Sequence, residues 1–366
     1  MRLLICAGGT GGGVYPALAV HQAVADRVEM TLWVGGKGGM EADLVARHHL
    51  PYAEISAAGV HGVGLRALPG NLVKLLRGYS ESRNILREFK PDVMLFTGGY
   101  VAVPMALAGA AVKNLLYVPD IEPGMALKAL AGFADVIALT CVESRAFFGR
   151  RKRTEVTGYP IRSDLKVLDR TAAIASFDLI PDLPVLLVIG GSKGAHSINQ
   201  AIFDNLTTLL ERVQVLHITG SADEAAAQVV RSNLPASLVG RYRPYAYLHE
   251  EISAAFSCAS LVMSRAGAST LGELPYYGLP AILVPYPFAW RYQKVNAEYL
   301  VKNGAAVMIE NADLSGQLKD AVNSIVGDEQ KMDTMRANMS SLAAPEAAVK
   351  IADLLVELGT RKAGNK

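Results

Sequence analysis

Residues 185–195 read VLLVIGGSKGA and combine a short apolar run with a glycine-rich turn. The same order occurs near the start of the chain, where residues 3–13 read LLICAGGTGGG. Segments with helical periodicity follow, from about Pro16 to Ala25 and from about Ser197 to Leu210. A buried strand, a glycine turn and a helix in this order open a βαβ unit. Two such openings about half a chain apart predict two Rossmann-like domains with doubly wound parallel sheets.

The rest of the chain continues this α/β pattern. Further apolar runs indicate strands at residues 31–34, 115–118, 261–264 and 281–284, and a helix over residues 268–277 that ends before Gly278. Tyr159-Pro160 disfavours helix, so we place a linker near residues 158–168. The expected division is a first domain over 1–163, a second over 164–343, and a C-terminal segment over 344–366. The amphipathic pattern of residues 345–358 predicts a helix that packs back on the first domain.

The composition excludes several classes of protein. The chain has 366 residues, and 51% hydrophobic residues exclude disorder. A net charge of +2 gives no general attraction to nucleic acid. The three cysteines are far apart, which favours neither disulfides nor a metal site and suits a reducing cytoplasm. The start lacks the pattern of a signal peptide, and no apolar run reaches the roughly 18 residues of a membrane span.

The glycine turns do not match the common cofactor motifs. In the first turn, Val14 stands where a dinucleotide fingerprint has its third glycine, and strand 31–34 ends in Gly35-Gly36 instead of a ribose-binding carboxylate. Neither Lys37 nor Lys193 stands in a Walker A sequence. A nicotinamide enzyme and a P-loop nucleotidase are therefore disfavoured, although both turns remain suited to binding phosphate oxygens.

A third anion-binding turn follows the expected strand at 261–264. Residues 264–273 read SRAGASTLGE and place small and hydroxyl side chains at the start of a helix. Glu273 would repel a phosphate but can accept hydrogen bonds from two sugar hydroxyls. Gln293 and Asn296, three residues apart, share a helix face and carry amides that suit sugar hydroxyls. Taken alone, Glu273 has a solvated helix charge as its alternative explanation, and residues such as Gln293 and Asn296 are more often surface residues.

Taken together, five motifs resemble those of the MurG family, glycosyltransferase family 28. They are Gly8-Gly9-Thr10-Gly11-Gly12, Met40-Glu41-Ala42-Asp43-Leu44-Val45, Gly98-Gly99-Tyr100-Val101, Gly190-Gly191-Ser192-Lys193-Gly194-Ala195 and Ser264-Arg265-Ala266-Gly267. They occur in the family's order along nearly the whole chain. The resemblance implies a GT-B fold with two domains facing a cleft. It also implies inverting transfer of N-acetylglucosamine from its UDP donor to lipid I, which yields lipid II for peptidoglycan synthesis.

The resemblance also implies the site residues. For the donor these are Arg162, Gly191, Ser192, Ala268, Ser269 and Thr270 for UDP, Glu273 for its ribose, the backbone near His249 for uracil, and Gln293 and Asn296 for the sugar. For the acceptor they are Thr10, Gly11, Gly12, Gly13 and Tyr100, the first three facing its diphosphate. No cofactor is implied, and the glycine turns lack a DxD-like carboxylate pair, which agrees with transfer that needs no metal. Further implied partners are an anionic membrane surface and other proteins of cell-wall synthesis.

The acceptor side departs from the family pattern. Gly13 replaces a histidine of the first loop, and Tyr117-Val118-Pro119-Asp120 replaces a His-Glu-Gln-Asn stretch. A third departure, Gly158-Tyr159-Pro160, stands in the linker where the family has Gly-Asn-Pro. The first two changes remove the usual polar candidates for a general base. Asp120 and Glu122 are the nearest ionisable residues in the replaced stretch, so we expect one of them to take the proton. Helix capping by Asp120 and a solvated charge at Glu122 explain them equally well.

Residues 65–90 interleave leucines with cations, as a helix lying on a membrane surface does. We expect Lys74, Arg77 and the neighbouring leucines to reach anionic lipid, with Arg150–Arg153 adding to this surface. A buried leucine stripe with solvated charges explains the pattern equally well. The membrane reading places the protein peripherally on the cytoplasmic face.

Two other functions stay open. A related glycolipid transferase, for instance one acting on diacylglycerol, would share the donor site but use another acceptor. A catalytically silent subunit that binds a UDP-sugar would explain Gly13 and the lost His-Glu stretch.

Overall fold

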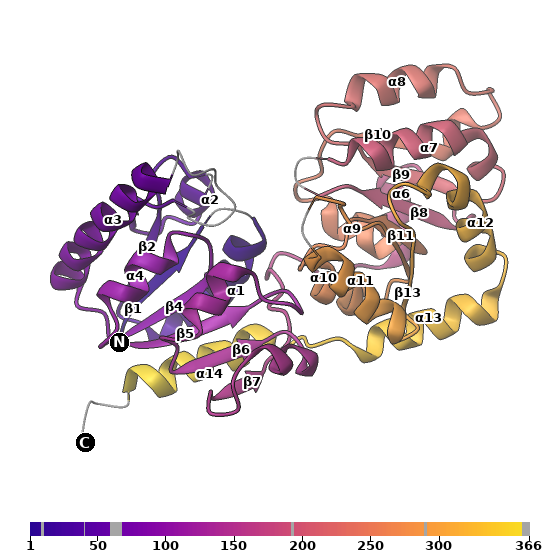
Figure 1. Cartoon of the computed structure of the whole chain (residues 1–366). Coiled ribbons are helices and arrows are strands. Elements are labelled where there is room, and N and C mark those ends of the chain that lie inside the picture. The colour runs from indigo at the N-terminus through magenta and orange to yellow at the C-terminus, as the bar shows by residue number, and fades with distance from the viewer. Residues whose placement is uncertain (9–10, 40, 59–67, 192–193, 289–290, 361–366) are drawn as a thin grey trace. The chain divides into compact units, whose positions relative to one another are not determined.

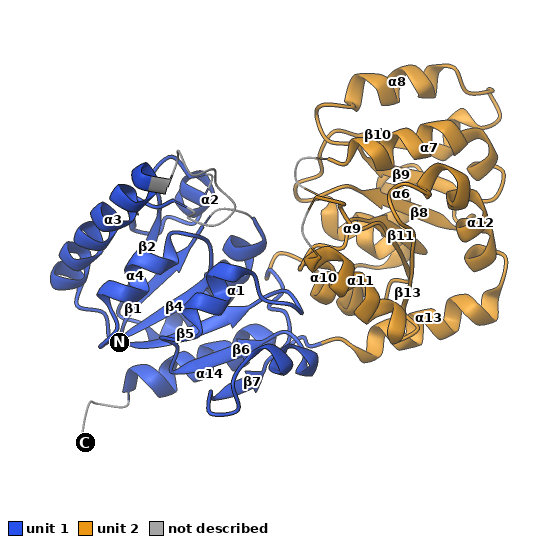
Figure 2. Ribbon diagram, viewed as in Figure 1, with its two compact units in different colours: residues 1–162, 344–366 blue, residues 163–343 orange. Residues whose placement is uncertain are grey.

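The computed structural model describes residues 1–8, 11–39, 41–58, 68–191, 194–288 and 291–360. The chain divides into two compact units, which Figure 2 shows in different colours. The first unit contains residues 1–162 and 344–366, and the second contains residues 163–343.

The first unit has a seven-stranded parallel sheet in the order β3-β2-β1-β4-β5-β6-β7 (Figure 1). Its strands are β1 (Arg2–Ala7), β2 (Met30–Gly36), β3 (Tyr52–Ile55), β4 (Val93–Gly98), β5 (Lys113–Val118), β6 (Val136–Leu139) and β7 (Thr154–Val156). Its helices are α1 (Gly11–Val24), α2 (Glu41–Ala46), α3 (Leu68–Phe89), α4 (Ala102–Ala108), α5 (Met125–Leu130) and α14 (Ala347–Thr360), with 3₁₀ turns η1 (Ala25–Arg27) and η2 (Val142–Phe147). The expected strands at 3–7, 31–34 and 115–118 are confirmed.

The expected start of the first helix at Pro16 is wrong. Helix α1 begins at Gly11, so Pro16 lies inside it. Proline has no N–H, so residue 16 cannot donate the intrahelical bond to the carbonyl of residue 12. The three glycines at 11–13, which the sequence suggested as a turn, therefore form the first turn of the helix.

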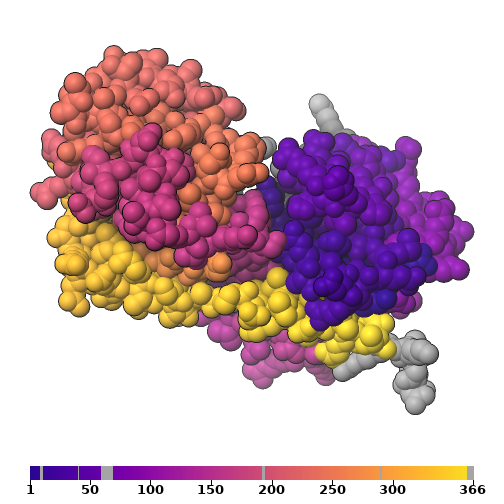
Figure 3. Space-filling model, turned by 180° about the vertical axis from the view of Figure 1, so that it is seen from behind, coloured from indigo at the N-terminus to yellow at the C-terminus, as the bar shows by residue number. Residues whose placement is uncertain are grey.

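The last helix of the chain belongs to the first unit. Helix α14 packs against α1, β4 and β5 and buries Ile351, Leu355 and Leu358. Arg153 binds both carboxylate oxygens of Glu357 at 2.8 and 3.1 Å. Figure 3 shows this yellow helix against the indigo residues of the N-terminus.

The second unit has a six-stranded parallel sheet in the order β10-β9-β8-β11-β12-β13. Its strands are β8 (Val185–Ile189), β9 (Gln214–Ile218), β10 (Tyr242–Tyr245), β11 (Leu261–Ser264), β12 (Ala281–Leu283) and β13 (Ala306–Met308). Its helices are α6 (Arg170–Ser176), α7 (His196–Leu209), α8 (Glu224–Ser232), α9 (Ile252–Cys258), α10 (Thr270–Tyr277), α11 (Tyr292–Lys302), α12 (Leu314–Val326) and α13 (Glu329–Ser341), with the 3₁₀ turn η3 (Val239–Arg241).

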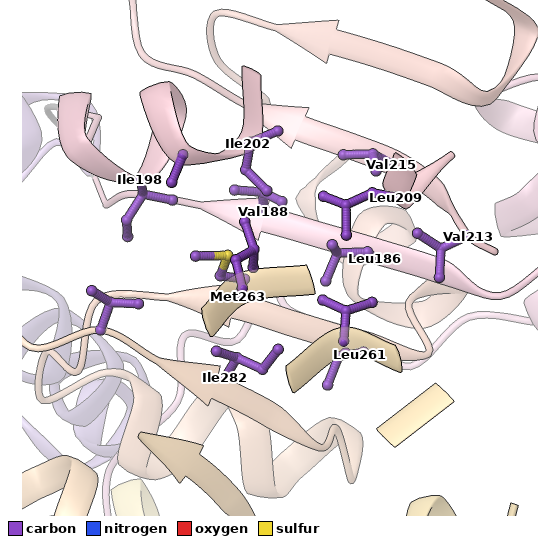
Figure 4. Packing of buried hydrophobic residues seen from close by; sticks show 14 of the residues in the cluster. Leu186, Val188, Ile198, Ile202, Leu209, Val213, Val215, Leu261, Met263 and Ile282 are labelled. Atoms are coloured by element: carbon purple, nitrogen blue, oxygen red, sulfur yellow. The ribbon is translucent and has the colours of Figure 1, made fainter. Parts of the chain in front are cut away.

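The core of the second unit follows from its apolar strands. Alternate side chains of β8 and β11 pack against Ile198 and other buried residues of α7, as Figure 4 shows. These are Leu186, Val188, Leu261 and Met263. Strands β8 and β11 match their predicted bounds, and α10 ends as expected with Gly278 in the left-handed conformation (φ 64°). Both strands point their carboxyl ends to the same edge of the sheet, which fixes where the following loops lie.

Candidate active site

Each sheet reverses its strand order at one point, and the glycine turns flank that point. In the first unit β1 and β4 are neighbours, and in the second β8 and β11 are neighbours. Ligands of doubly wound sheets bind outside the carboxyl ends of strands at such a switch point. The turns predicted from sequence after β1, β4, β8 and β11 therefore occupy the expected ligand-binding edges of the two units.

The turn after β8 requires glycine for geometric reasons. Gly194 has φ 73°, and a Cβ there would lie 2.5 Å from the carbonyl oxygen of Thr219. Gly191 also has a positive φ, 91°, and is exposed with open space around its Cα. Ser192 lies outside the described residues. The turn leads directly into α7, whose N-terminal end favours an anion.

The turn after β11 leads into α10 and places three expected donor residues together. Ala268 and Thr270 are buried, and Ser269 is half-buried. The Thr270 hydroxyl donates to the carbonyl of Gly267 at 2.6 Å, so this side chain shapes the turn. Glu273 lies one turn further along α10 and is half-buried. The start of α10 thus carries backbone amides at residues 268–270 and, in its first turn, the carboxylate of Glu273.

The two amide residues of α11 differ in their surroundings. Gln293 is half-buried, and its Oε1 accepts the backbone N–H of Tyr286 at 2.8 Å. Asn296 is fully buried, and its Nδ2 donates to the carbonyl of Ala266 at 3.1 Å. Packing of α11 against the 264–270 turn covers the Asn296 side chain, which holds that turn in place. A contact of Asn296 with the donor sugar stays a prediction.

Arg265 is a residue of this site that the sequence analysis did not single out for a role. Its guanidinium donates to Ser197 Oγ at 2.7 Å, to Asn311 Oδ1 at 2.9 Å and to the carbonyl of Val284 at 3.1 Å. These partners follow β8, β13 and β12, respectively, so one side chain ties together the loops at the carboxyl edge. Burial lowers the pKa of Arg265, which is half-buried. Its position directly after a strand, in a glycine-rich turn, was the available signal.

A buried polar network lies beneath the turn after β8. Asp223 accepts hydrogen bonds from Asn199 Nδ2 at 2.7 Å and pairs with His196 Nδ1 at 2.8 Å. His217 lies between Asn199 Oδ1 and the hydroxyl of Tyr242, both at 3.0 Å. Because Asn199 Oδ1 can only accept, His217 Nε2 carries the proton and Nδ1 accepts from Tyr242. The network connects α7 to β9 and β10.

Two expected donor residues lie further from these turns in the chain. His249 is exposed, its ring lies 4.7 Å from that of Tyr247, and its backbone N–H donates to Glu251 at 3.1 Å. Arg162 closes the first unit, and its guanidinium lies 5.0 Å from the centre of the Tyr15 ring on α1. The structure thus places Arg162 against the first unit, at the point where the chain passes to the second.

The first unit brings the turns after β1 and β4 into contact. Gly99 has φ 86°, and a Cβ there would lie 2.5 Å from the carbonyl oxygen of Gly8. Gly11, Gly12 and Gly13 form the first turn of α1, and Tyr100 is exposed in the turn after β4. Thr10 lies outside the described residues. The expected acceptor residues that are described therefore share one edge of the sheet.

Packing does not require a glycine at position 13. A Cβ at this position would lie 3.4 Å from the carbonyl oxygen of Thr97 and 3.6 Å from its hydroxyl, which are ordinary contacts. The Thr97 hydroxyl donates to the Gly13 carbonyl at 2.7 Å. The backbone therefore has room for at least the first atom of a side chain where the resembling family has histidine.

Glu41 is a second residue for which the sequence analysis proposed no role. It is 1% exposed, and its Oε1 accepts the backbone N–H of Gly36 at 2.7 Å. A Cβ at Gly8 or at Gly39 would lie 2.4 Å from that oxygen, so the carboxylate fills the space beside the first glycine turn. Its position in the motif 40–45 was the signal. Burial and the charge of Glu41 raise the pKa of Cys6 well above its usual range.

The two candidate bases follow β5, the strand next to β4. Asp120 and Glu122 are half-buried in the bend between β5 and α5. Glu122 Oε1 lies 3.3 Å from Lys128 Nζ on α5. Tyr117 and Val118, which stand where the family has His-Glu, are fully buried in β5 and cannot exchange a proton with a substrate.

Helix α3 exposes an apolar stripe. Leu72, Val73 and Leu76 are 57%, 64% and 64% exposed, which rules out the buried leucine stripe as the explanation for these positions. Lys74 is exposed among them, and Arg77 pairs with Glu81 at 3.1 Å. Residues 65–67 lie outside the described part. The Arg153 guanidinium is bound by Glu357 and Glu155, and its contribution to a lipid-binding surface stays a prediction.

The helices of the described residues include none with the length and apolarity of a transmembrane span. Within the same residues, His, Cys, Asp and Glu do not gather in groups of three that could hold a metal ion.

Comparison with known proteins gives a consistent picture. The glycosyltransferase family 28 N-terminal domain matches residues 3–138, and the C-terminal domain of that family matches residues 185–354. A relative from Roseiflexus sp. (strain RS-1) is 38% identical over 99% of this chain and 96% of its own length. One from Desulforamulus reducens is 36% identical over 95% of this chain and 96% of its own. Both are named UDP-N-acetylglucosamine–N-acetylmuramyl-(pentapeptide) pyrophosphoryl-undecaprenol N-acetylglucosamine transferase.

Solved structures agree with the predicted architecture. The crystal structure of Acinetobacter baumannii MurG is 25% identical and covers 97% of this chain and 99% of its own, with a TM-score of 0.79. The calicheamicin glycosyltransferase CalG4 is 14% identical and covers 99% of each chain, with a TM-score of 0.66. Two parallel-sheet units with glycine-rich turns at their carboxyl edges define a GT-B glycosyltransferase, and this predicted fold is confirmed. Within that class, the chain belongs to glycosyltransferase family 28.

Proposed function

We propose that this protein transfers N-acetylglucosamine from UDP-N-acetylglucosamine to the muramoyl sugar of lipid I, with inversion at the anomeric carbon, and so forms lipid II for peptidoglycan synthesis. The strongest support is the similarity to relatives that are named as N-acetylglucosamine transferases, for instance one at 38% identity over 99% of this chain. The site supports it as well, because glycine turns, a carboxylate and an amide stand at the sheet edges where a nucleotide-sugar donor and a diphosphate acceptor would bind.

The donor binds to the second unit in this proposal. The amides of Ala268 and Ser269 and the turn at 190–194 hold the diphosphate, since backbone N–H groups at a helix start favour an anion. Glu273 accepts the ribose hydroxyls, and the backbone near His249 meets uracil. Gln293 binds the sugar. Arg162 supplies a positive charge to the UDP portion as it departs.

The acceptor binds to the first unit. Residues 10–13 and Tyr100 receive the diphosphate and the sugar of lipid I, and buried Glu41 keeps the first turn in its shape. Asp120 or Glu122 takes the proton from the attacking hydroxyl as the bond from that oxygen to the anomeric carbon forms. The bond to UDP breaks in the same step, and UDP leaves with the electron pair.

The exposed stripe of α3 gives the protein a place to meet its lipid substrate. Leu72, Val73 and Leu76 insert among acyl chains, while Lys74 meets anionic headgroups. In this proposal the protein lies peripherally at the cytoplasmic face of the membrane and has other cell-wall synthesis proteins as further partners.

A silent UDP-sugar-binding subunit is the second candidate, and Gly13 together with buried Val118 favours it. One experiment separates the candidates. The full chain is incubated with labelled UDP-N-acetylglucosamine and, in separate reactions, a short-chain lipid I analogue or diacylglycerol. Product formation, UDP release and donor binding are measured. We expect transfer to the lipid I analogue. Transfer only to diacylglycerol would support a related glycolipid transferase, and donor binding without transfer to either acceptor would support the silent subunit.

A further inference from the structure

An exposed aromatic pair lies beside the amide that we assign to the donor sugar. Phe288 is 81% exposed, the highest value for a large hydrophobic side chain among the described residues, and Tyr286 is 45% exposed. Their rings meet edge to face, with centres 5.6 Å apart. Both stand in the loop after β12, at the carboxyl edge of the second sheet. Exposing two aromatic rings together is costly in water, so a function for them is expected.

The base of this pair is held in place. The Arg265 guanidinium lies 5.3 Å from the centre of the Tyr286 ring and donates to the carbonyl oxygens of Val284 and Pro285 at 3.1 and 3.4 Å. The same guanidinium reaches Ser197 at the start of α7. The Tyr286 ring is therefore fixed relative to the helix that follows the glycine turn at 190–194.

The adjacent amide has a defined orientation. The backbone N–H of Tyr286 donates to Gln293 Oε1. An N–H group can bond only to the oxygen of a side-chain amide, because the NH₂ group accepts no hydrogen bond. The NH₂ end of Gln293 consequently points away from Tyr286 and is the end that can donate to a ligand. One hydrogen bond thus links the backbone of the aromatic pair to the Gln293 side chain.

We propose that Tyr286 and Phe288 form a platform against which the apolar C–H face of the donor's sugar ring packs, while the Gln293 NH₂ group donates to a hydroxyl oxygen of that sugar. This rests on the proposed function and specifies how the sugar is recognised. A sugar ring offers a C–H face and hydroxyl oxygens side by side, which matches the pair and the amide. Two rings bury at most about 500 Å², less than the roughly 800 Å² per partner of a stable protein interface, so a protein partner fits the pair less well.

The test compares binding of UDP-N-acetylglucosamine and of UDP by isothermal titration calorimetry. We expect Phe288→Ala to weaken UDP-N-acetylglucosamine binding about fivefold to tenfold and to leave UDP binding unchanged, because only the former carries the sugar. Phe288→Tyr keeps the ring and should bind both as the parent does. Val229→Ala, at an exposed apolar position on α8, is the matched control and should change neither.

Equal binding of the nucleotide sugar by Phe288→Ala and the parent would overturn the platform, as would an equal loss for UDP and UDP-N-acetylglucosamine. A raised KM for the lipid I analogue with unchanged donor binding would assign the rings to the acceptor and also overturn it. Failure of the proposed function is seen separately, in the parent, as absent transfer to the lipid I analogue despite donor binding. A parent that binds UDP but not UDP-N-acetylglucosamine would overturn both.

Discussion

Glu273 is the side chain whose loss should most directly weaken the binding of the nucleotide UDP. We expect Glu273→Ala to reduce UDP affinity about thirtyfold, since removing a half-buried carboxylate that accepts two hydroxyls costs about 2 kcal/mol. Isothermal titration with UDP measures this. Glu298→Ala, an exposed carboxylate on α11, is the control and should bind UDP as the parent does. Unchanged UDP affinity in Glu273→Ala would contradict the assignment.

The general base is tested by variants that keep shape. We expect either Asp120→Asn or Glu122→Gln to lower turnover roughly 100-fold while UDP affinity stays at the parental value, because a base acts mainly in the transition state. Turnover with the lipid I analogue and calorimetry with UDP are measured together.

Gly13→His provides the contrasting variant, since the backbone admits a Cβ there. Near-parental turnover in both carboxylate variants would show that neither is the base. A gain in turnover from Gly13→His alone, with no effect of the other two, would point to the histidine position as the missing element.

Single residues also show where sequence reasoning ended. The three-residue spacing of Gln293 and Asn296 correctly places both on α11, but only packing decides that Asn296 is buried against Ala266. Glu41 and Arg265 stand in motifs that the sequence displays. Their contacts join segments far apart in the chain, from Gly8 to Glu41 and from Ser197 to Asn311. Such contacts depend on strand order, which no local pattern encodes.

At the scale of elements, prediction succeeded where apolar runs meet glycine. Strands β8 and β11 have the predicted bounds because a buried parallel strand is apolar throughout and the glycine turn ends it. The start of α1 was missed because glycine normally indicates a turn, whereas Gly11–Gly13 form helix against the carboxyl ends of β1 and β4. Tertiary packing therefore overrides local propensity at the very edge that carries the site.

Helix α3 should bind anionic lipid through its exposed stripe. We expect Lys74→Glu to weaken binding to phosphatidylglycerol vesicles at low salt by about tenfold or more, because reversal replaces attraction by repulsion. Vesicle sedimentation measures the bound fraction. Lys302→Glu on α11 changes net charge equally and should bind as the parent does. Equal losses of vesicle binding in both variants would show that only the net charge matters and would contradict a role for α3.

The strand β9 contains a residue that should make stability depend on pH. Burial lowers the pKa of His217 to about 3, against an ordinary value of 6.5. Between these values the unfolded chain binds a proton that the folded chain does not, so the free energy of unfolding is largest above pH 6.5 and falls as the pH drops toward 3. We expect the second unit to lose about 2 kcal/mol between pH 7.5 and pH 5 through this residue.

Urea unfolding at the two pH values measures this difference. His217→Phe removes the titrating group, and although it loses two hydrogen bonds at both pH values, the difference between them should shrink by the same amount. A parental pH dependence in His217→Phe would contradict the assignment and would leave other titrating groups to explain it.

At the scale of the whole molecule, the order of the chain and the division into units do not coincide. Residues 163–343 form the second unit between two segments of the first, so the first unit is complete only when α14 has packed on α1, β4 and β5. The helix contributes five fully or nearly fully buried side chains, namely Ala347, Ile351, Ala352, Leu355 and Leu358. The stability of the first unit thus depends on α14.

Leu355→Ala tests this dependence. Leu355 is fully buried, so we expect its truncation to cost the first unit about 2–5 kcal/mol and to leave the second unit unchanged. Hydrogen exchange should then speed up in β4 and β5 but not in β8 and β9. Val349→Ala, an exposed position of the same helix, should change neither, and Leu318→Ala on α12 should show the reverse pattern. Faster exchange in both units of Leu355→Ala would mean that the two units unfold together, and α14 would then stabilise the whole protein instead of the first unit alone.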